Sequence, residues 1–216
     1  MRLFALVAAA LLAGCLSAEP PSGARSPSLA TPVAASGEVE APSGRYLLDP
    51  AHASVLWRVS HLGLSMYTGR FERVAGTLEF DARAPERSTL QVVIDAASVS
   101  TGYAALGRDR DFDAEIAEAL GAAEAPEIGF VATGIARTGP ATGQVRGELT
   151  LNGQTHPLTL AVTFYGAKLD PLARKTRMGF AARGVLDRAA WGVDRWSGFG
   201  VGREVELIIE AEFLKA

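Results

Sequence analysis

Three histidines, His52, His61 and His156, are the side chains of this chain best suited to hold a metal ion or to transfer a proton. No two of them are four residues apart, which is the spacing that places two ligands on one face of a helix. The chain also has a single cysteine, so the thiolates of a structural zinc site are missing. The sequence therefore predicts no metal site.

Nucleophilic catalysis would need a serine with a base beside it, and Ser54 and Ser65 do lie near His52 and His61 in the sequence. Neither serine stands in a Gly-x-Ser-x-Gly stretch, the sharp turn that exposes the nucleophile of an α/β-hydrolase. The sequence therefore predicts no catalytic residues and a protein that is not an enzyme.

Two further stretches imitate ligand-binding motifs without completing them. Residues 109–113, Asp-Arg-Asp-Phe-Asp, resemble the start of a calcium-binding loop, but Ala114 replaces the glycine of its turn and Leu120 replaces its bidentate glutamate. Residues 198–202 are rich in glycine, but no helical pattern follows them to present an N-terminus to a phosphate. We expect the first stretch to begin a helix and the second to form a loop at a rim.

A cluster of cations surrounds the turn signal Asp-Pro at residues 170–171, and it comprises Lys168, Arg174, Lys175 and Arg177. Two interpretations remain open, which are a solvated hairpin and a docking patch for an anionic lipid or a phosphorylated ligand. The chain as a whole has a net charge of -3 and an isoelectric point of about 5.7. That balance gives no basic surface for nucleic acid.

The segments that must position these residues alternate between apolar and polar side chains. The pattern is clearest at residues 205–213, where the odd positions are apolar and three of the even positions are glutamate. Alternation with one polar face is typical of an antiparallel sheet. Similar runs occur at residues 55–61, 77–81, 90–95, 149–151 and 158–164. With turn signals between the runs, about eight strands predict an all-β sandwich or barrel.

One segment, residues 109–120, departs from this alternation and has Phe112, Ile116 and Leu120 at helical spacing. Acidic residues crowd its first turn, where the helix dipole favours them, and Gly121 follows as a stop signal. The sequence predicts one short helix, inserted between strands and covering one end of the sheet structure.

The first 14 residues have the pattern of a signal peptide, because Arg2 precedes an apolar run at 3–12 that is too short to span a bilayer. Residues 12–15, Leu-Ala-Gly-Cys, resemble the lipobox of bacterial lipoproteins. The resemblance implies that Cys15 becomes the mature N-terminus and carries a lipid, and Leu16 after it favours the outer membrane. The alternative is an ordinary signal peptide with an incidental cysteine.

Residues 15–44 are rich in Pro, Ala, Ser and Gly and have few large apolar side chains. Such a segment cannot bury enough surface to offset its conformational entropy, so we expect a disordered tether. The predicted organisation is a lipoprotein signal peptide at 1–14, this tether at 15–44, and one β-barrel domain at 45–216.

From Arg45 onward, six motifs occur in an order that resembles the YceI-like family of bacterial periplasmic proteins. They are residues 46–57, 61–71, 94–102, 126–130, 147–160 and 187–192, and they include His61-Leu62-Gly63, Gly69-Arg70-Phe71 and Asp187-Arg188-Ala189-Ala190-Trp191-Gly192. Each motif alone is weak, but together they are specific, because they occur in order from Arg45 to near the C-terminus. One departure is Ala189-Ala190, where the family commonly has Ser-Asp.

The resemblance implies an extended, antiparallel, eight-stranded lipocalin-like barrel with an apolar tunnel that holds a long-chain isoprenoid, such as a quinone tail, or a related amphiphile. A barrel of eight strands leaves room for about one small ligand. Alternation selects the lining, because the side chains between polar neighbours must face inward. The predicted lining set is Val55, Trp57, Val59, Leu90, Val92, Ile94, Phe130, Leu149, Leu160, Val162, Leu207 and Ile209.

Two polar residues, His61 and Arg188, are predicted to lie near one mouth of this tunnel, with the helix of residues 109–120 nearby. His61 shares its parity with Val59, so it should point inward near the end of a strand, where Gly63 and Gly69 permit a bend. Two roles remain open for it, which are a hydrogen bond to a polar head group and a buried histidine satisfied by the backbone.

The predicted function is binding of a long-chain amphiphilic lipid, isoprenoid or quinone-like, for carriage, storage or sequestration in the bacterial envelope. The protein would be lipid-anchored at the periplasmic face of the outer membrane. No cofactor is expected apart from such a ligand, and a homodimer stays open. The alternative is a non-enzymatic envelope adaptor or stress protein, whose barrel is filled by its own side chains and whose surface binds a partner.

Overall fold

The alternating segments pair as antiparallel strands, as the sequence predicts. The computed structural model describes residues 41–107 and 109–216, all within one compact unit, Val33–Ala216. The predicted signal peptide, Cys15 and the predicted tether up to residue 40 lie outside the described residues. The strands are β1 (Gly44–His61), β2 (Ser65–Phe71), β3 (Val74–Phe80), β4 (Thr89–Asp95), β5 (Val99–Ser100), β6 (Glu127–Arg137), β7 (Thr142–Leu151), β8 (Gln154–Asp170), β9 (Lys175–Asp187) and β10 (Val201–Lys215).

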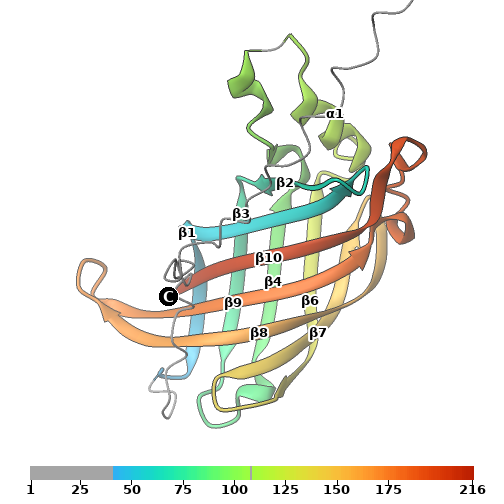
Figure 1. Cartoon of the computed structure of the whole chain (residues 1–216). Helices are drawn as coiled ribbons and strands as arrows, with labels where there is room; N and C mark the ends of the chain where they lie inside the picture. Colours follow the sequence, from blue (N-terminus) through green and yellow to red (C-terminus); the bar gives the residue numbers. More distant parts are fainter. Residues whose placement is uncertain (1–40, 108) are drawn as a thin grey trace, which may run out of the picture. The chain divides into compact units, whose positions relative to one another are not determined.

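Eight of these strands close into a barrel, which confirms the predicted fold (Figure 1). β10 pairs with β1 and β9, and the order runs on through β8, β7, β6, β4 and β3 back to β1. β1 is long enough to have two successive partners on one edge, since Tyr46 lies opposite Leu78 of β3 and Trp57 lies opposite Gly69 of β2. β2 and the two-residue β5 therefore extend one side of the barrel and are not part of the ring.

The folded domain begins slightly before the predicted boundary at residue 45. Ala41 is buried, and the Tyr46 hydroxyl donates a hydrogen bond of 2.7 Å to the Pro42 carbonyl oxygen. Burial also raises the pKa of the Tyr46 hydroxyl. Residues 41–44 therefore pack with the barrel, although the sequence assigned them to the tether.

Because neighbouring strands are antiparallel, the connections gather at two ends of the barrel. The helix end contains residues 62–64, 96–107, 109–126, 152–153 and 188–200, and Figure 1 shows it at the top and upper right. The hairpin end contains residues 81–88, 138–141 and 171–174, together with the start of β1. At the hairpin end, the turn between β8 and β9 projects from the barrel on the left of Figure 1.

The predicted helix is present as α1 (Phe112–Ala119), somewhat shorter than the predicted span. Asp111 caps it, because its side chain accepts a hydrogen bond of 3.0 Å from the backbone N–H of Ala114. The acidic stretch at 109–113 thus begins a helix, as predicted. Within residues 41–107 and 109–216, the connections contain five short 3₁₀ helices, η1 (Pro85–Arg87), η2 (Ala96–Ser98), η3 (Tyr103–Leu106), η4 (Arg188–Trp191) and η5 (Ser197–Phe199).

Residues 61–71, HLGLSMYTGRF, form the hairpin between β1 and β2. Leu62 and Gly63 both adopt positive φ angles, 56° and 69°, which is the geometry of a tight turn that matches strand twist. His61 then lies opposite Ser65 at the end of β1. The stretch is therefore a turn at the helix end of the barrel.

Candidate ligand-binding cavity

The barrel encloses a cavity of about 710 Å³. Side chains from every strand of the ring and from α1 line it, and it reaches from Phe112 at the helix end to Pro85 and Pro140 at the hairpin end. A volume of this size lies in the usual range of pockets that bind small molecules. The interior is therefore hollow, and its own side chains do not fill it.

All fourteen residues predicted from the sequence line this cavity. They are Val55, Trp57, Val59, His61, Leu90, Val92, Ile94, Phe130, Leu149, Leu160, Val162, Arg188, Leu207 and Ile209. Their contact with a ligand stays a prediction. Their placement follows from strand register. Residues that lie opposite each other on neighbouring strands point to the same face of the sheet, as Val92 and Phe130 do, or Trp57 and Leu207.

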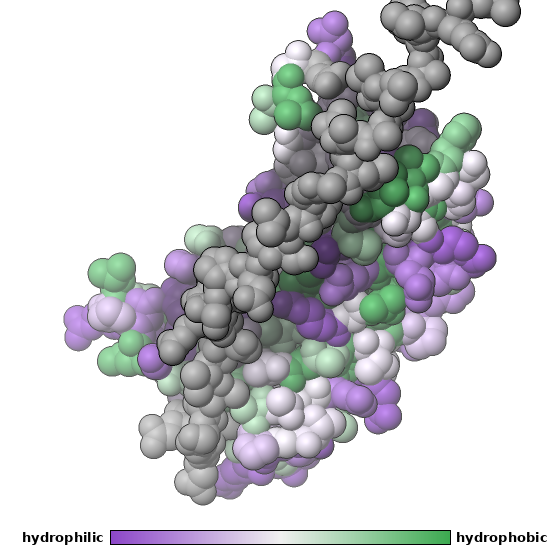
Figure 2. All heavy atoms as spheres, in the orientation of Figure 1, coloured by the Kyte–Doolittle hydropathy of each residue, from purple (hydrophilic) through white to green (hydrophobic). Residues whose placement is uncertain are grey.

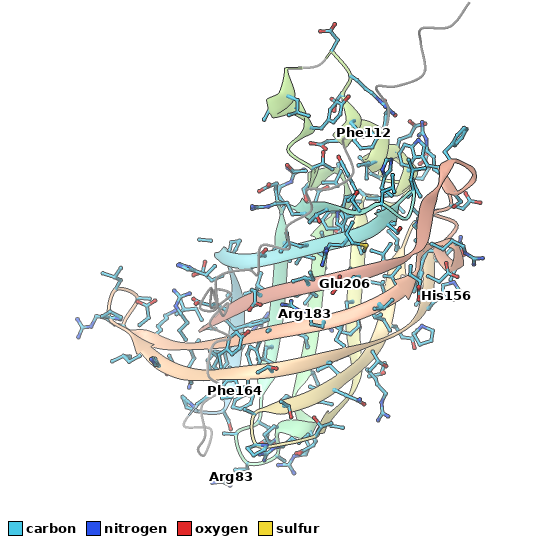
Figure 3. All side chains as sticks on the ribbon, in the orientation of Figure 1. Arg83, Phe112, His156, Phe164, Arg183 and Glu206 are labelled. Atoms are coloured by element: carbon cyan, nitrogen blue, oxygen red, sulfur yellow. The ribbon has the colours of Figure 1, made fainter. Side chains whose placement is uncertain are left out.

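Charged side chains occupy the outer face of the same strands. Arg58 and Glu206 form an ion pair of 3.2 Å between β1 and β10, and Arg183 and Glu210 form one of 3.6 Å between β9 and β10. Figure 3 labels Arg183 and Glu206 on their strands. Exposed pairs of this kind contribute little to stability, but they keep the outer face wet while the inner face stays apolar.

Five aromatic residues form what we call the aromatic cluster at the helix end of the cavity, and all of them line it. Ring centroids are 6.2 Å apart for Trp57 and Tyr67, 5.9 Å for Tyr67 and Phe112, 5.3 Å for Tyr103 and Phe112, and 5.7 Å for Phe112 and Trp196. Phe112, labelled in Figure 3, belongs to α1 and contacts three of the other four rings. The cluster therefore ties α1 to the barrel beside the cavity.

Sequence reasoning missed Tyr67, Tyr103 and Trp196 as lining residues. Tyr67 belongs to β2, where the alternation is weak, and the other two lie in connections that have no strand period. Their only signal in the sequence is the presence of large aromatic side chains in segments that otherwise look like loops.

Trp57 also explains why position 69 is glycine. The indole ring lies so close to Gly69 that a Cβ atom there would be 2.2 Å from Cζ2 of Trp57. Within the described residues, the indole Nε1 is the one buried side-chain nitrogen or oxygen that has no hydrogen-bond partner. Trp57 therefore contributes to the cavity wall as an apolar ring.

His61 lies at the rim of the cavity and is exposed. The alternative of a buried histidine satisfied by the backbone is therefore wrong. The hairpin of β1 and β2 ends the wall at this position, so the imidazole reaches solvent while it still borders the apolar interior. A polar group placed in this way can hydrogen bond to the head of a ligand whose tail lies in the barrel.

Arg188 lines the cavity but is not a free head-group ligand, contrary to the expectation from sequence. The side chain is buried, at 7 % exposure, and burial lowers the pKa of its guanidinium. All five of its N–H groups donate hydrogen bonds within residues 193–202, to the carbonyl oxygens of Val193, Arg195, Val201 and Gly202 and to the hydroxyl of Ser197. Arg188 therefore holds the connection between β9 and β10 in place.

The described residues contain neither a cluster of metal ligands nor a membrane-spanning helix. Within 41–107 and 109–216, no three His, Cys, Asp or Glu side chains come together in a way that could hold a metal ion. No helix in the part of the chain that the structure describes is long and apolar enough to cross a membrane.

Comparison with known proteins identifies the barrel. A family model described as the YceI-like domain matches residues 46–213. The chain belongs to the YceI-like family. A UPF0312 protein of Azotobacter vinelandii is 35% identical over 178 residues, which are 82% of this chain and 90% of the relative. A UPF0312 protein of Pseudomonas savastanoi pv. phaseolicola is 36% identical over 156 residues, 71% of this chain and 79% of the relative.

Solved structures of this YceI-like fold match the barrel at lower sequence identity. BcnA of Burkholderia cenocepacia superposes with a TM-score of 0.66 at 22% identity, covering 76% of this chain and 98% of that one. A domain from Saccharophagus degradans, described as a polyisoprenoid binding domain implicated in plant cell wall breakdown, superposes with a TM-score of 0.59 at 15% identity. It covers 81% of this chain and 100% of that domain.

Proposed function

We propose that this YceI-like protein binds a long-chain amphiphilic lipid, isoprenoid or quinone-like, with the apolar tail inside the barrel. The observation that carries the proposal is the cavity of about 710 Å³, whose wall is made mostly of apolar side chains. The polyisoprenoid binding described for the Saccharophagus degradans domain supports the isoprenoid class. The adaptor alternative required a barrel filled by its own side chains, so the cavity argues against it.

The free energy available for such binding comes from the transfer of the tail out of water. Burial of hydrocarbon contributes about 0.8 kcal/mol per methylene group. A tail of about ten such groups therefore gains about 8 kcal/mol before the cost of ordering the ligand. Carriage, storage or sequestration of the bound lipid are the roles that such binding would serve.

The polar head of the ligand lies at the helix end, where His61 borders the apolar interior. Arg188 takes no part, because its donors are used within the connection of residues 193–202. The head group is therefore bound by few polar contacts, and most of the affinity comes from the tail.

Native mass spectrometry of the protein purified from its own membranes tests this function. The expected spectrum shows barrels that carry one hydrocarbon-rich lipid each, and fragmentation of the bound species identifies an isoprenoid or quinone. Purified protein that carries no lipid, and that does not bind an added polyprenyl probe, would contradict the proposal.

The proposed location is the bacterial envelope, with the protein anchored at the periplasmic face of the outer membrane through lipid on Cys15. A single acyl chain gives only marginal binding, whereas the two or three chains of a bacterial lipoprotein give stable attachment. Cys15→Ser should release the protein into the soluble fraction or block its processing. Membrane association that survives this substitution, measured by cell fractionation, would argue for a different anchor.

A further inference from the structure

The turn between β8 and β9 presents apolar side chains to solvent. We call residues 168–175 the hairpin tip. Leu172 is 94% exposed and Leu169 is 71% exposed, and no large hydrophobic residue in the described part of the chain is more exposed than Leu172. Figure 2 shows hydrophobic and hydrophilic side chains side by side on the hairpin that projects at the left.

Hydrogen bonds hold this turn in one conformation. The Asp170 side chain accepts hydrogen bonds of 2.8 Å and 2.9 Å from the backbone N–H groups of Leu172 and Ala173, and the N–H of Arg174 donates one of 2.8 Å to the Asp170 carbonyl oxygen. Leu172 is thus fixed at the apex of an ordered turn, where it cannot fold back against the barrel.

Arg177 fixes the base of the same hairpin. Its guanidinium lies 2.6 Å from a carboxylate oxygen of Asp49 on β1, 2.7 Å from one of Asp170 and 2.9 Å from one of Glu212 on β10. This neighbour lowers the pKa of Asp49 to about 2. Arg177 and Asp170 are consequently used inside the hairpin, and neither contributes a free charge to its tip.

Three cations remain at the hairpin tip, Lys168, Arg174 and Lys175. All three are exposed, and among the described residues none of them forms an ion pair. Two exposed leucines and three unpaired cations therefore lie within eight residues of each other. Cations beside an apolar group are the combination that binds the interface of an anionic bilayer.

The helix end provides an instructive contrast. It also exposes large apolar residues, with Leu64 at 84% and Phe199 at 79% exposure. Its neighbouring segment, 109–118, carries five carboxylates and one arginine, and that arginine, Arg110, is paired with Glu115. Anionic head groups would be repelled there, so charge favours the hairpin tip as the membrane-facing site.

We infer that the hairpin tip docks on an anionic lipid bilayer, with Leu169 and Leu172 in the interface and the three cations at phosphate groups. The inference rests on the proposed function, because a lipid carrier works beside a bilayer, and the cavity also reaches this end of the barrel, at Pro85 and Pro140. The start of β1 lies at this end as well, since Ser43 Oγ accepts a hydrogen bond of 2.8 Å from the backbone N–H of Ala82. The segment that precedes the barrel therefore joins it at the end that we place nearest to the membrane.

Vesicle sedimentation of residues 33–216 tests the docking. This unit contains every strand of the closed barrel and leaves out the predicted signal peptide and Cys15. We expect the parent to bind vesicles that contain phosphatidylglycerol and to bind phosphatidylcholine vesicles weakly. Leu172→Ser should lower binding to the anionic vesicles about tenfold, and the double variant Lys168→Gln with Lys175→Gln should lower it about 25-fold at low salt, roughly fivefold for each charge.

Leu64→Ser is the matched control, since it removes an equally exposed leucine from the helix end. It should leave vesicle binding unchanged. Docking through the hairpin tip is wrong if Leu172→Ser binds like the parent, if Leu64→Ser causes the larger loss, or if the parent binds neither kind of vesicle. Competition by soluble glycerol phosphate would likewise overturn it, because it would indicate a small phosphate site in place of a bilayer.

A ligand-binding measurement separates this inference from the proposed function. The Leu172→Ser variant should bind a fluorescent polyprenyl probe in solution with the affinity of the parent, because the hairpin tip is not part of the cavity lining. Loss of vesicle binding with intact probe binding supports docking alone. A parent protein that does not bind the probe at all would contradict the proposed function. The vesicle experiment would then still test the docking of the hairpin tip by itself.

Discussion

The barrel wall and the helix end of this protein keep their structure by different means. The wall is a continuous ladder of backbone hydrogen bonds, and its inner face consists of apolar side chains of one parity. The helix end has no such ladder, and it depends on the aromatic cluster around Phe112 and on the five hydrogen bonds of Arg188.

The barrel wall therefore determines which ligand tails fit into the cavity, and the helix end determines how a ligand reaches it. The wall sets the volume and the apolar character of the cavity, which under the proposed function determine what tail can enter. The helix end supplies the one exposed imidazole at the rim, His61, and a layer of aromatic rings between the cavity and solvent. Substitutions in the two regions should therefore affect tail binding and head-group binding to different extents.

The largest effect is expected for a charge on the wall. Leu160 is buried on the inner face of β8, so Leu160→Asp places an unpaired carboxylate in an apolar cavity. We expect binding of a polyprenyl probe to fall about a hundredfold or more, with a loss of several kcal/mol in the free energy of unfolding. Thr159→Asp, on the exposed outer face, should change neither quantity, and equal losses in both variants would contradict the assignment of faces.

A substitution of Arg188 tests the helix end. Arg188→Met keeps much of the volume but leaves four carbonyl oxygens and one hydroxyl without their donor. The free energy of unfolding in urea should fall by about 3 kcal/mol. Arg188→Lys should restore only part of it, because an ammonium group has three donors instead of five. A loss below about 1 kcal/mol would mean that water replaces these hydrogen bonds easily.

Gly69→Ala tests where the wall meets the aromatic cluster. The added methyl group would lie 2.2 Å from Cζ2 of the Trp57 ring, so the indole or the backbone at position 69 must shift. Such overpacking should cost about 1–3 kcal/mol of stability, measured by thermal or urea unfolding. Gly129→Ala, where a Cβ atom meets no other atom within 4 Å, is the control. Similar losses at both glycines would show that contact with Trp57 does not explain the effect, because relief from the entropy of a glycine in the unfolded chain would stabilise the protein instead.

The smallest expected effect concerns His61 and the head group. His61→Ala should weaken binding of an isoprenoid with a polar head about fivefold, because one hydrogen bond contributes roughly 1 kcal/mol. Binding of a hydrocarbon of similar length should stay the same, as measured by competition with the polyprenyl probe. Equal losses for both ligands would show that His61 only packs against the tail.

Much of the wall could be predicted from the sequence, because alternation depends only on local periodicity. β9 shows where this reasoning weakens. Its inner face includes Ala182 and Gly184, and a Cβ atom on Gly184 would lie 2.6 Å from Cδ2 of Leu160. The large side chain on β8 thus requires a small residue opposite, which removes the alternation that would have marked β9 as a strand.

The helix end could be predicted only in part, because tertiary contacts decide the roles of its residues. The helical spacing of apolar residues and the acidic first turn predicted α1 correctly, since both signals are local. The role of Arg188 could not be derived in the same way, because the carbonyl groups that it binds come together only in the folded connection of residues 193–202. From the sequence, an arginine near the mouth of a predicted pocket suggested a ligand for a head group. In the structure, all five N–H donors of Arg188 bind groups of the protein itself.

Filling the barrel without adding charge tests the central claim most directly. Val162 faces the cavity between Gly143 and Ala182 on the neighbouring strands, whereas Ala161 next to it is exposed on the outer face. The measurement is the affinity of folded Val162→Trp and Ala161→Trp for a polyprenyl probe. We expect a loss of about tenfold or more for Val162→Trp and none for Ala161→Trp. A folded Val162→Trp variant that binds the probe as tightly as the parent would show that the ligand does not lie in the barrel.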